Sequence, residues 1–128
     1  ADDAIRRLRH LAETDQPTSG RAAYTMARLF QSVCTRHLDD AAALVDNGLI
    51  DKLRPLGVEA GYGYALAAWV CLQRSTRNNI EPDQHAQLRE QMQTWWQRAT
   101  LLQPASALVH RFPTVAEAQE AMNGGGYE

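Results

Sequence analysis

The stretch from Glu81 to Leu102, EPDQHAQLREQMQTWWQRATLL, gives the clearest structural information in this chain. Its apolar residues recur mostly at steps of three and four, which is the period of one face of an α-helix. They are Leu88, Met92, Trp95, Trp96, Ala99 and Leu102. Pro82 suits the first turn of a helix, because the N–H that it lacks would have no intrahelical acceptor there. The stretch therefore predicts a long helix that begins at Pro82.

Similar apolar stripes lie on both sides of this helix. The predicted helices cover residues 3–12, 22–34, 41–47, 49–59 and 65–72 before it, and 104–110 and 114–123 after it. Clusters of β-branched residues and strict alternation, which indicate strands, are absent from the sequence. The sequence thus predicts an all-α fold of about six or seven helices, with a single domain over 1–123 and a flexible tail over 124–128.

Several residues predict where these helices begin, bend or end. Asp39 stands where it can cap the helix over 41–47. Pro55 predicts a kink or an early stop, since proline lacks the helical N–H. The segment Gly61-Tyr-Gly63 is expected to form a turn. Thr114 and Glu117 match the capping box of a last helix.

Composition and charge exclude several classes of protein. The chain has 128 residues and is 45% hydrophobic, as expected of an ordinary globular domain rather than a disordered chain. Its net charge of −2 offers no basic excess for a phosphate backbone, so we expect no nucleic-acid partner. No apolar run approaches the roughly 20 residues of a membrane span, so we expect no membrane-spanning segment in this sequence.

The two cysteines, Cys34 and Cys71, lie too far apart in sequence for a Cys-x-x-Cys motif. We expect them to form one disulfide, as a pair does in an oxidising compartment. The alternative is two buried thiols that act as small apolar side chains. The chain opens Ala1-Asp2-Asp3 without methionine, which suggests a processed N-terminus or an excised piece. A disulfide and a processed N-terminus would both suit a periplasmic or secreted protein, so we expect that location. The alternative is a cytoplasmic location.

Small residues recur at matched places along the chain. Ala22, Ala65 and Ala107 lie 43 and 42 residues apart, each near the start of a predicted helix. Gly57 and Ala99 each precede one of these alanines by eight positions. Two antiparallel helices can cross closely near their turn only where the side chains are this small. The spacing favours a repeat of helix pairs, and the alternative is a non-repetitive bundle in which the alanines coincide.

The segment WWQRATLLQPASA, Trp95 to Ala107, resembles the Sel-one-like repeat, a branch of the tetratricopeptide superfamily. LRPLGVEAGYGYA, residues 53–65, and AAYTMA, residues 22–27, are similar to the same repeat. The match is degenerate, because Gln103 replaces the glycine of the turn and extra residues surround Pro17. The resemblance implies a short, irregular α-solenoid of antiparallel helix pairs. It also implies a non-catalytic protein-binding surface built from the second helices, without a cofactor.

The candidate contact residues are aromatic or charged. Trp95 and Trp96 are about 100° apart on a helix, so one is expected in the core and Trp95 is the candidate for a groove or partner. The other candidates are Tyr62, Tyr64, Arg74, Arg77, Asp39 and Asp40. The carboxylates of Asp39 and Asp40 could attract a basic partner. No pattern typical of a catalytic or metal site is present, so we expect neither.

These observations predict a non-catalytic protein-binding module that binds a protein partner. Its narrower form is a bacterial periplasmic immunity protein that binds and neutralises a toxin or enzyme. The alternative is a small helical enzyme or ligand-binding bundle with a pocket near Trp95, Trp96 and His110. A closed apolar cavity with convergent polar groups would favour that alternative.

Overall fold

The computed structural model describes residues 6, 20–46, 60–77 and 80–124. Its elements are α2 (Gly20–Arg36), α3 (Leu38–Asp46), α4 (Ala60–Ser75), α5 (Pro82–Leu102), α6 (Ala105–Arg111), the 3-10 turn η2 (Pro113–Val115) and α7 (Ala116–Gly124). The described ranges contain no strand, and the predicted all-α fold is confirmed. The helices predicted over 3–12 and 49–59, the kink at Pro55 and the tail over 125–128 lie outside these ranges, except for the single helical residue Arg6.

Helix α5 begins at Pro82, as the sequence predicts. The backbone N–H of Glu81 donates to Oε1 of Gln84 at 3.4 Å, which closes the start of the helix. The buried face of α5 consists of Leu88, Met92, Trp96 and Ala99. The period of the apolar residues therefore identified both the helix and the side that packs inward.

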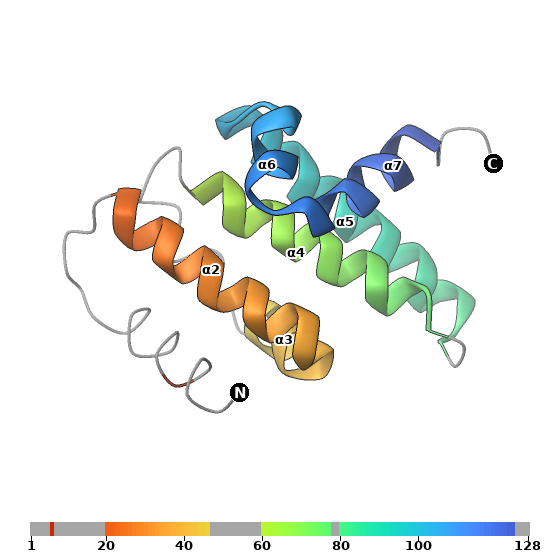
Figure 1. The fold of residues 1–128 in the computed structure, drawn as a ribbon. Helices are drawn as coiled ribbons and strands as arrows, with labels where there is room; N and C mark the ends of the chain where they lie inside the picture. Colours follow the sequence, from red (N-terminus) through yellow and green to blue (C-terminus); the bar gives the residue numbers. More distant parts are fainter. Residues whose placement is uncertain (1–5, 7–19, 47–59, 78–79, 125–128) are drawn as a thin grey trace.

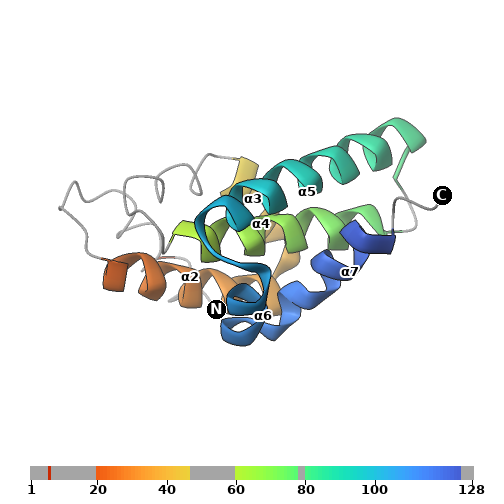
Figure 2. The same ribbon diagram turned by 90° about the horizontal axis from the view of Figure 1, so that it is seen from above.

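Helix α4 is the centre of the molecule (Figures 1 and 2). Every residue from Ala60 to Leu72 is buried, because α2, α3, α5, α6, η2 and α7 all pack around this helix. Alanine and glycine make up much of its sequence, and small side chains let neighbouring helices approach from several directions. The turn predicted at Gly61-Tyr-Gly63 is wrong, since this segment is the first part of α4.

At Gly61, α4 lies close to the end of α5. A Cβ atom at this position would lie 3.3 Å from the carbonyl oxygen of Ala99 and 3.4 Å from side-chain atoms of Leu102 and Gln103. Ala99 is itself fully buried. Gly61 was expected in a turn and is not one of the recurring small residues, so this close approach does not test the predicted repeat.

Helices α2 and α3 meet at His37. The His37 N–H donates to the carbonyl oxygen of Val33 at 2.7 Å, and the His37 carbonyl oxygen accepts from the N–H of Ala41 at 3.0 Å. Asp39 therefore lies inside the first turn of α3, and its predicted capping position is wrong. Its carboxylate, with that of Asp40, still faces the positive end of the helix dipole.

The C-terminal part of the described chain packs onto α4. Phe112, Val115 and Ala118 are buried, and the ring of Tyr62 meets that of Phe112 edge to face at 5.4 Å between centroids. Oε2 of Glu117 accepts from Nε1 of Trp69 at 3.3 Å and from Nε2 of Gln73 at 2.6 Å. The carboxylate of Glu117 thus tethers α7 to α4.

The predicted capping box at the start of α7 is wrong. Thr114 lies in η2, and its hydroxyl is buried without a hydrogen-bond partner among the described residues. Gly124, predicted to begin the tail, is the last residue of α7.

Helix α4 does not provide the protein-binding surface that the resemblance implies on the second helices. The repeat interpretation makes α4 a second helix with an open face, but the structure buries α4 on all sides. The first helices of two repeat units lie outside the described residues, so the solenoid stays a prediction. In the described ranges, no helix combines the length and the apolarity needed to cross a membrane.

Candidate functional site

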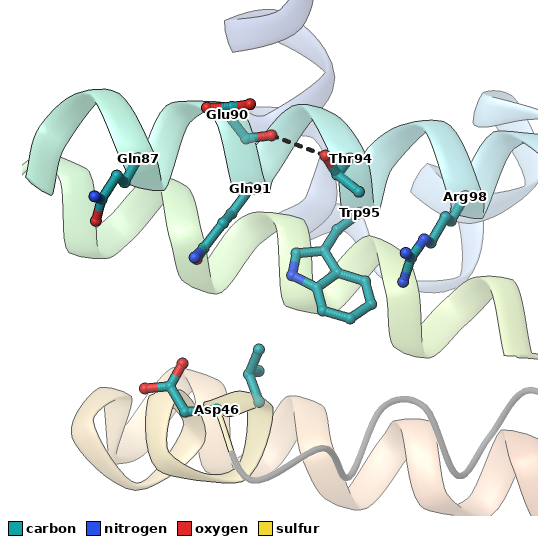
Figure 3. A pocket seen from close by; sticks show the side chains of 8 residues that line it. Asp46, Gln87, Glu90, Gln91, Thr94, Trp95 and Arg98 are labelled. Atoms are coloured by element: carbon teal, nitrogen blue, oxygen red, sulfur yellow. Dashed lines mark hydrogen bonds between the residues drawn. The ribbon is translucent and has the colours of Figure 1, made fainter.

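A groove runs between the C-terminal end of α3 and the side of α5 that faces it (Figure 3). We call it the α5 groove, and it has a volume of about 510 Å³. It is lined by Val45 and Asp46 of α3, and by Gln87, Glu90, Gln91, Thr94, Trp95 and Arg98 of α5. Five of these eight side chains are exposed to solvent and six of the eight are polar or charged, so the groove is open and mixed in character.

Trp95 is the main apolar side chain that α5 contributes to the groove. Its indole is half-buried and stacks on the buried ring of Tyr64, with 5.7 Å between centroids and 19° between the planes. The guanidinium carbon of Arg98 lies 5.1 Å from the centroid of the indole, a cation–π contact. These two neighbours hold the indole in place, so a partner would meet an aromatic side chain that is already ordered.

The end of the groove nearest Asp46 carries amide side chains (Figure 3). Gln87 and Gln91 lie one helical turn apart on α5, and Figure 3 shows both pointing towards α3. Oε1 of Gln91 lies 3.9 Å from Sγ of Cys71, a weak hydrogen bond. Gln87 has no side-chain hydrogen bond to any described residue, so its amide can donate to and accept from a ligand.

A smaller hollow of about 290 Å³ adjoins the α5 groove and shares Asp46, Gln87 and Gln91 with it. Two ion pairs join α3 to Arg74 of α4 and to Arg77 just after it, and both arginines line this hollow. Nη1 of Arg74 lies 3.4 Å from Oδ1 of Asp46, and Nη1 of Arg77 lies 2.7 Å from Oδ1 of Asp39. Both pairs are partly or largely exposed, so each contributes little to stability.

The structure divides the predicted contact residues into two groups. Trp95 lines the groove, while Arg74 and Arg77 line the adjoining hollow, and the carboxylate of Asp39 reaches Arg77. Asp40 is exposed in the first turn of α3. These residues come from α3, α4, α5 and, for Arg77, the segment just after α4.

The prediction that Tyr62 and Tyr64 contact a partner at the surface is wrong. Their exposed fractions are 6% and 3%, because the segment that carries them is helical and packed on all sides. Tyr62 packs against Phe112, and Tyr64 lies against Trp95. Tyr64 therefore acts on the groove only by positioning the indole of Trp95.

Cys34 and Cys71 are both buried free thiols, so the predicted disulfide is not present in the structure. Burial raises the pKa of the Cys34 thiol far above its usual range. Burial also raises the pKa of Cys71 to about 11, with Arg74 lowering it and Asp46 raising it by smaller amounts. The structure agrees with the alternative prediction, in which both cysteines are buried thiols that act as small apolar side chains.

The residues proposed for an enzymatic or ligand-binding pocket do not come together. Trp95 lines the α5 groove, Trp96 is buried on the other side of α5, and His110 is exposed on α6. Within the described ranges, no group of three or more His, Cys, Asp or Glu side chains could hold a metal ion.

Sequence reasoning missed Asp46, Gln87, Gln91 and Arg98 as groove residues. Asp46 has no sequence signal, and that of the other three is their spacing on α5, four residues from Gln87 to Gln91 and seven from Gln91 to Arg98. Such a polar stripe is usually a solvated helix face, and it lines a groove here only because the end of α3 lies opposite it. Comparisons with family models, with curated proteins and with solved structures gave no match to this chain.

Proposed function

We propose that this chain is a non-catalytic protein-binding module and that the α5 groove is its binding surface. The observation that carries the proposal is Trp95, a half-buried indole held between neighbours in an open groove. Aromatic side chains in such positions carry much of the binding energy of protein interfaces. Because Tyr64 and Arg98 already order this one, little rotamer freedom is lost on binding.

The shape of the groove favours a segment of a protein over a small metabolite. Small-molecule sites are usually concave and mostly apolar, with a few convergent polar groups. Here the exposed side chains of Asp46, Gln87, Glu90, Gln91 and Thr94 line an open trough. A polar chain that can exchange hydrogen bonds along its length suits such a lining.

The narrower form of the proposal is a bacterial periplasmic immunity protein that neutralises a toxin or enzyme. The resemblance to a family of protein-binding repeats supports this form, and inhibition by covering a partner's surface needs no catalytic group. Its test is affinity capture from a bacterial extract with the intact chain and with a Trp95→Ala variant side by side. A toxin or secreted enzyme retained by the intact chain alone is the expected result.

The test of the general proposal is selection of peptides from a random display library on the intact chain. The selected peptides are then titrated against the chain while its tryptophan fluorescence is recorded. We expect binding that Trp95→Ala weakens by at least about 10-fold, because a central aromatic anchor contributes about 2 kcal/mol or more.

The matched control is Gln97→Ala, which changes an exposed residue of α5 that does not line the groove. This variant is expected to bind the selected peptides as the intact chain does. A library that yields no binder, or binders that ignore the loss of the indole, would contradict the proposal.

A further inference from the structure

The charged side chains that face across the α5 groove already have partners inside the molecule. Asp46 pairs with Arg74, with 3.4 Å between Oδ1 and Nη1. Arg98 lies over the indole of Trp95 and takes part in a further interaction. Glu90 lies at the outer rim, with its carboxylate directed away from α3 (Figure 3). The lining therefore offers a partner little charge that is not already balanced.

Uncharged hydrogen-bonding groups of the groove remain free. The indole N–H of Trp95 is not buried and has no acceptor in the described part of the chain. Gln87 has no side-chain hydrogen bond there either. Gln91 turns its Oε1 to the thiol of Cys71, with 3.9 Å between the oxygen and Sγ. Its NH2 group is therefore the end of the amide that is left for a ligand.

These free groups lie together and are mostly donors. Gln87, Gln91 and Trp95 occupy successive turns of α5 and point towards α3, with the indole nitrogen on the edge nearer Gln91 (Figure 3). Donors outnumber acceptors, because each amide carries an NH2 group, the indole has only its N–H, and Gln91 has turned its oxygen to Cys71. A ligand that fits these groups must therefore bring acceptors.

The acceptors that suit the groove are uncharged. The carboxylate of Asp46 lies at the same end as the two amides, and it disfavours an anionic acceptor beside it. A main-chain carbonyl oxygen accepts without bringing a charge. Carbonyl groups on one side of an extended chain recur about every 6.6 Å, and residues one turn apart on α5 are separated by about 6 Å.

Building on the protein-binding function above, we propose that the α5 groove binds an uncharged, extended segment of a partner protein through its main-chain carbonyl oxygens. The NH2 group of Gln91 and the indole N–H of Trp95 are the donors that recognise these oxygens. An apolar side chain of the segment lies against Trp95 and Val45, the apolar part of the lining. Recognition in this groove thus depends on hydrogen bonds and apolar contact rather than on ion pairs.

The experiment titrates the peptides selected from the random library against the intact chain and its variants by calorimetry. Gln91→Glu replaces the NH2 donor by an oxygen at almost unchanged shape, so it is expected to weaken binding by at least about 10-fold. Trp95→Phe keeps an aromatic ring without the N–H and should weaken binding by about 3-fold or more. Gln97→Glu makes the matched change at an exposed residue outside the groove and should leave the affinity unchanged.

Two further measurements separate recognition from a structural role. Replacing the main-chain oxygens of a peptide one at a time by sulfur, a weaker acceptor, should weaken binding to the intact chain at a defined position. At that position the sulfur should have little effect on binding to Gln91→Glu or to Trp95→Phe. Between about 0.05 and 0.5 M salt the affinity should change by less than about 2-fold, since no ion pair forms on binding. Circular dichroism establishes that each variant is folded.

Three results would overturn the inference. They are an affinity that falls steeply with salt, full affinity of both Gln91→Glu and Trp95→Phe, and sulfur substitutions without effect at any position. If the peptides need Trp95 but bind through charged side chains, this inference fails while the proposed function stands. If the library yields no binder, both fail.

Discussion

Replacing Glu117 by alanine removes the oxygen that joins α7 to the central helix. Oε2 of Glu117 accepts from the indole N–H of Trp69 at 3.3 Å and from the side-chain amide of Gln73 at 2.6 Å. The Trp69 side chain is only 8% exposed, so its N–H would lose an acceptor that water replaces poorly. The Gln73 amide is nearer to solvent and would lose less.

The expected loss of stability follows from these two bonds. A buried donor left without a partner costs about 1 kcal/mol or more, and the exposed bond adds a few tenths, so the total is about 1 to 2 kcal/mol. In a chain of this length each kcal/mol lowers the melting temperature by about 4 °C. We therefore expect Glu117→Ala to melt about 4 to 8 °C below the intact chain.

The assays are a thermal melt, which gives the melting temperature, and urea unfolding, which gives the free energy. Both are followed by circular dichroism and by tryptophan fluorescence, since coincident curves establish a two-state transition. Glu117→Gln keeps an oxygen that can accept and should lose about half as much as the alanine variant. Glu120→Ala is the matched control, because Glu120 is exposed on the same helix and forms no bond to any described side chain. Equal stability of the two alanine variants would refute the reasoning.

Three further predictions concern the core. Gly61→Val adds a branched side chain where even a Cβ atom would lie 3.3 Å from the carbonyl oxygen of Ala99. Urea unfolding should therefore show that the free energy of unfolding falls by about 2 kcal/mol or more. An unchanged free energy would contradict the close approach of α4 and α5. In the folded chain at pH 8, Cys34 and Cys71 should not react with a thiol reagent. When the chain is unfolded in urea without a reductant, both should react, whereas two cysteines joined by a disulfide would not. Stability should fall as the pH rises from about 9 to about 11, because the thiol of Cys71 ionises at a lower pH in the unfolded chain than in the folded one. Cys71→Ala should reduce this fall, and an unchanged dependence of stability on pH would show that other groups cause it.

The sequence predicted the parts of the fold that depend on local pattern. Pro82 and the apolar stripe that follows it identified α5, its start and its buried face. The absence of strand patterns from the sequence likewise predicted the all-α fold of the described ranges. These features depend only on local patterns, so a single sequence contains them.

The predictions from sequence were wrong where the structure depends on contacts between distant parts of the chain. Tyr62 stands between two glycines, which suggests a turn, but glycine also permits close helix packing, and α4 is buried on every side. Thr114 and Glu117 match a capping box, yet Glu117 bonds to Trp69, which is 48 residues away in sequence. The α5 groove exists only because α3 lies beside α5, and no local pattern indicates which helices become neighbours.

The central place of α4 has a consequence for how the chain folds during synthesis. Residues 60–72 leave the ribosome before Val115 and Ala118, which help to cover them, have been made. Until then, part of an unusually apolar helix is open to water and to other chains. Folding is therefore expected to finish only after α7 emerges, and nascent chains that stop short of this helix are expected to aggregate or to bind chaperones.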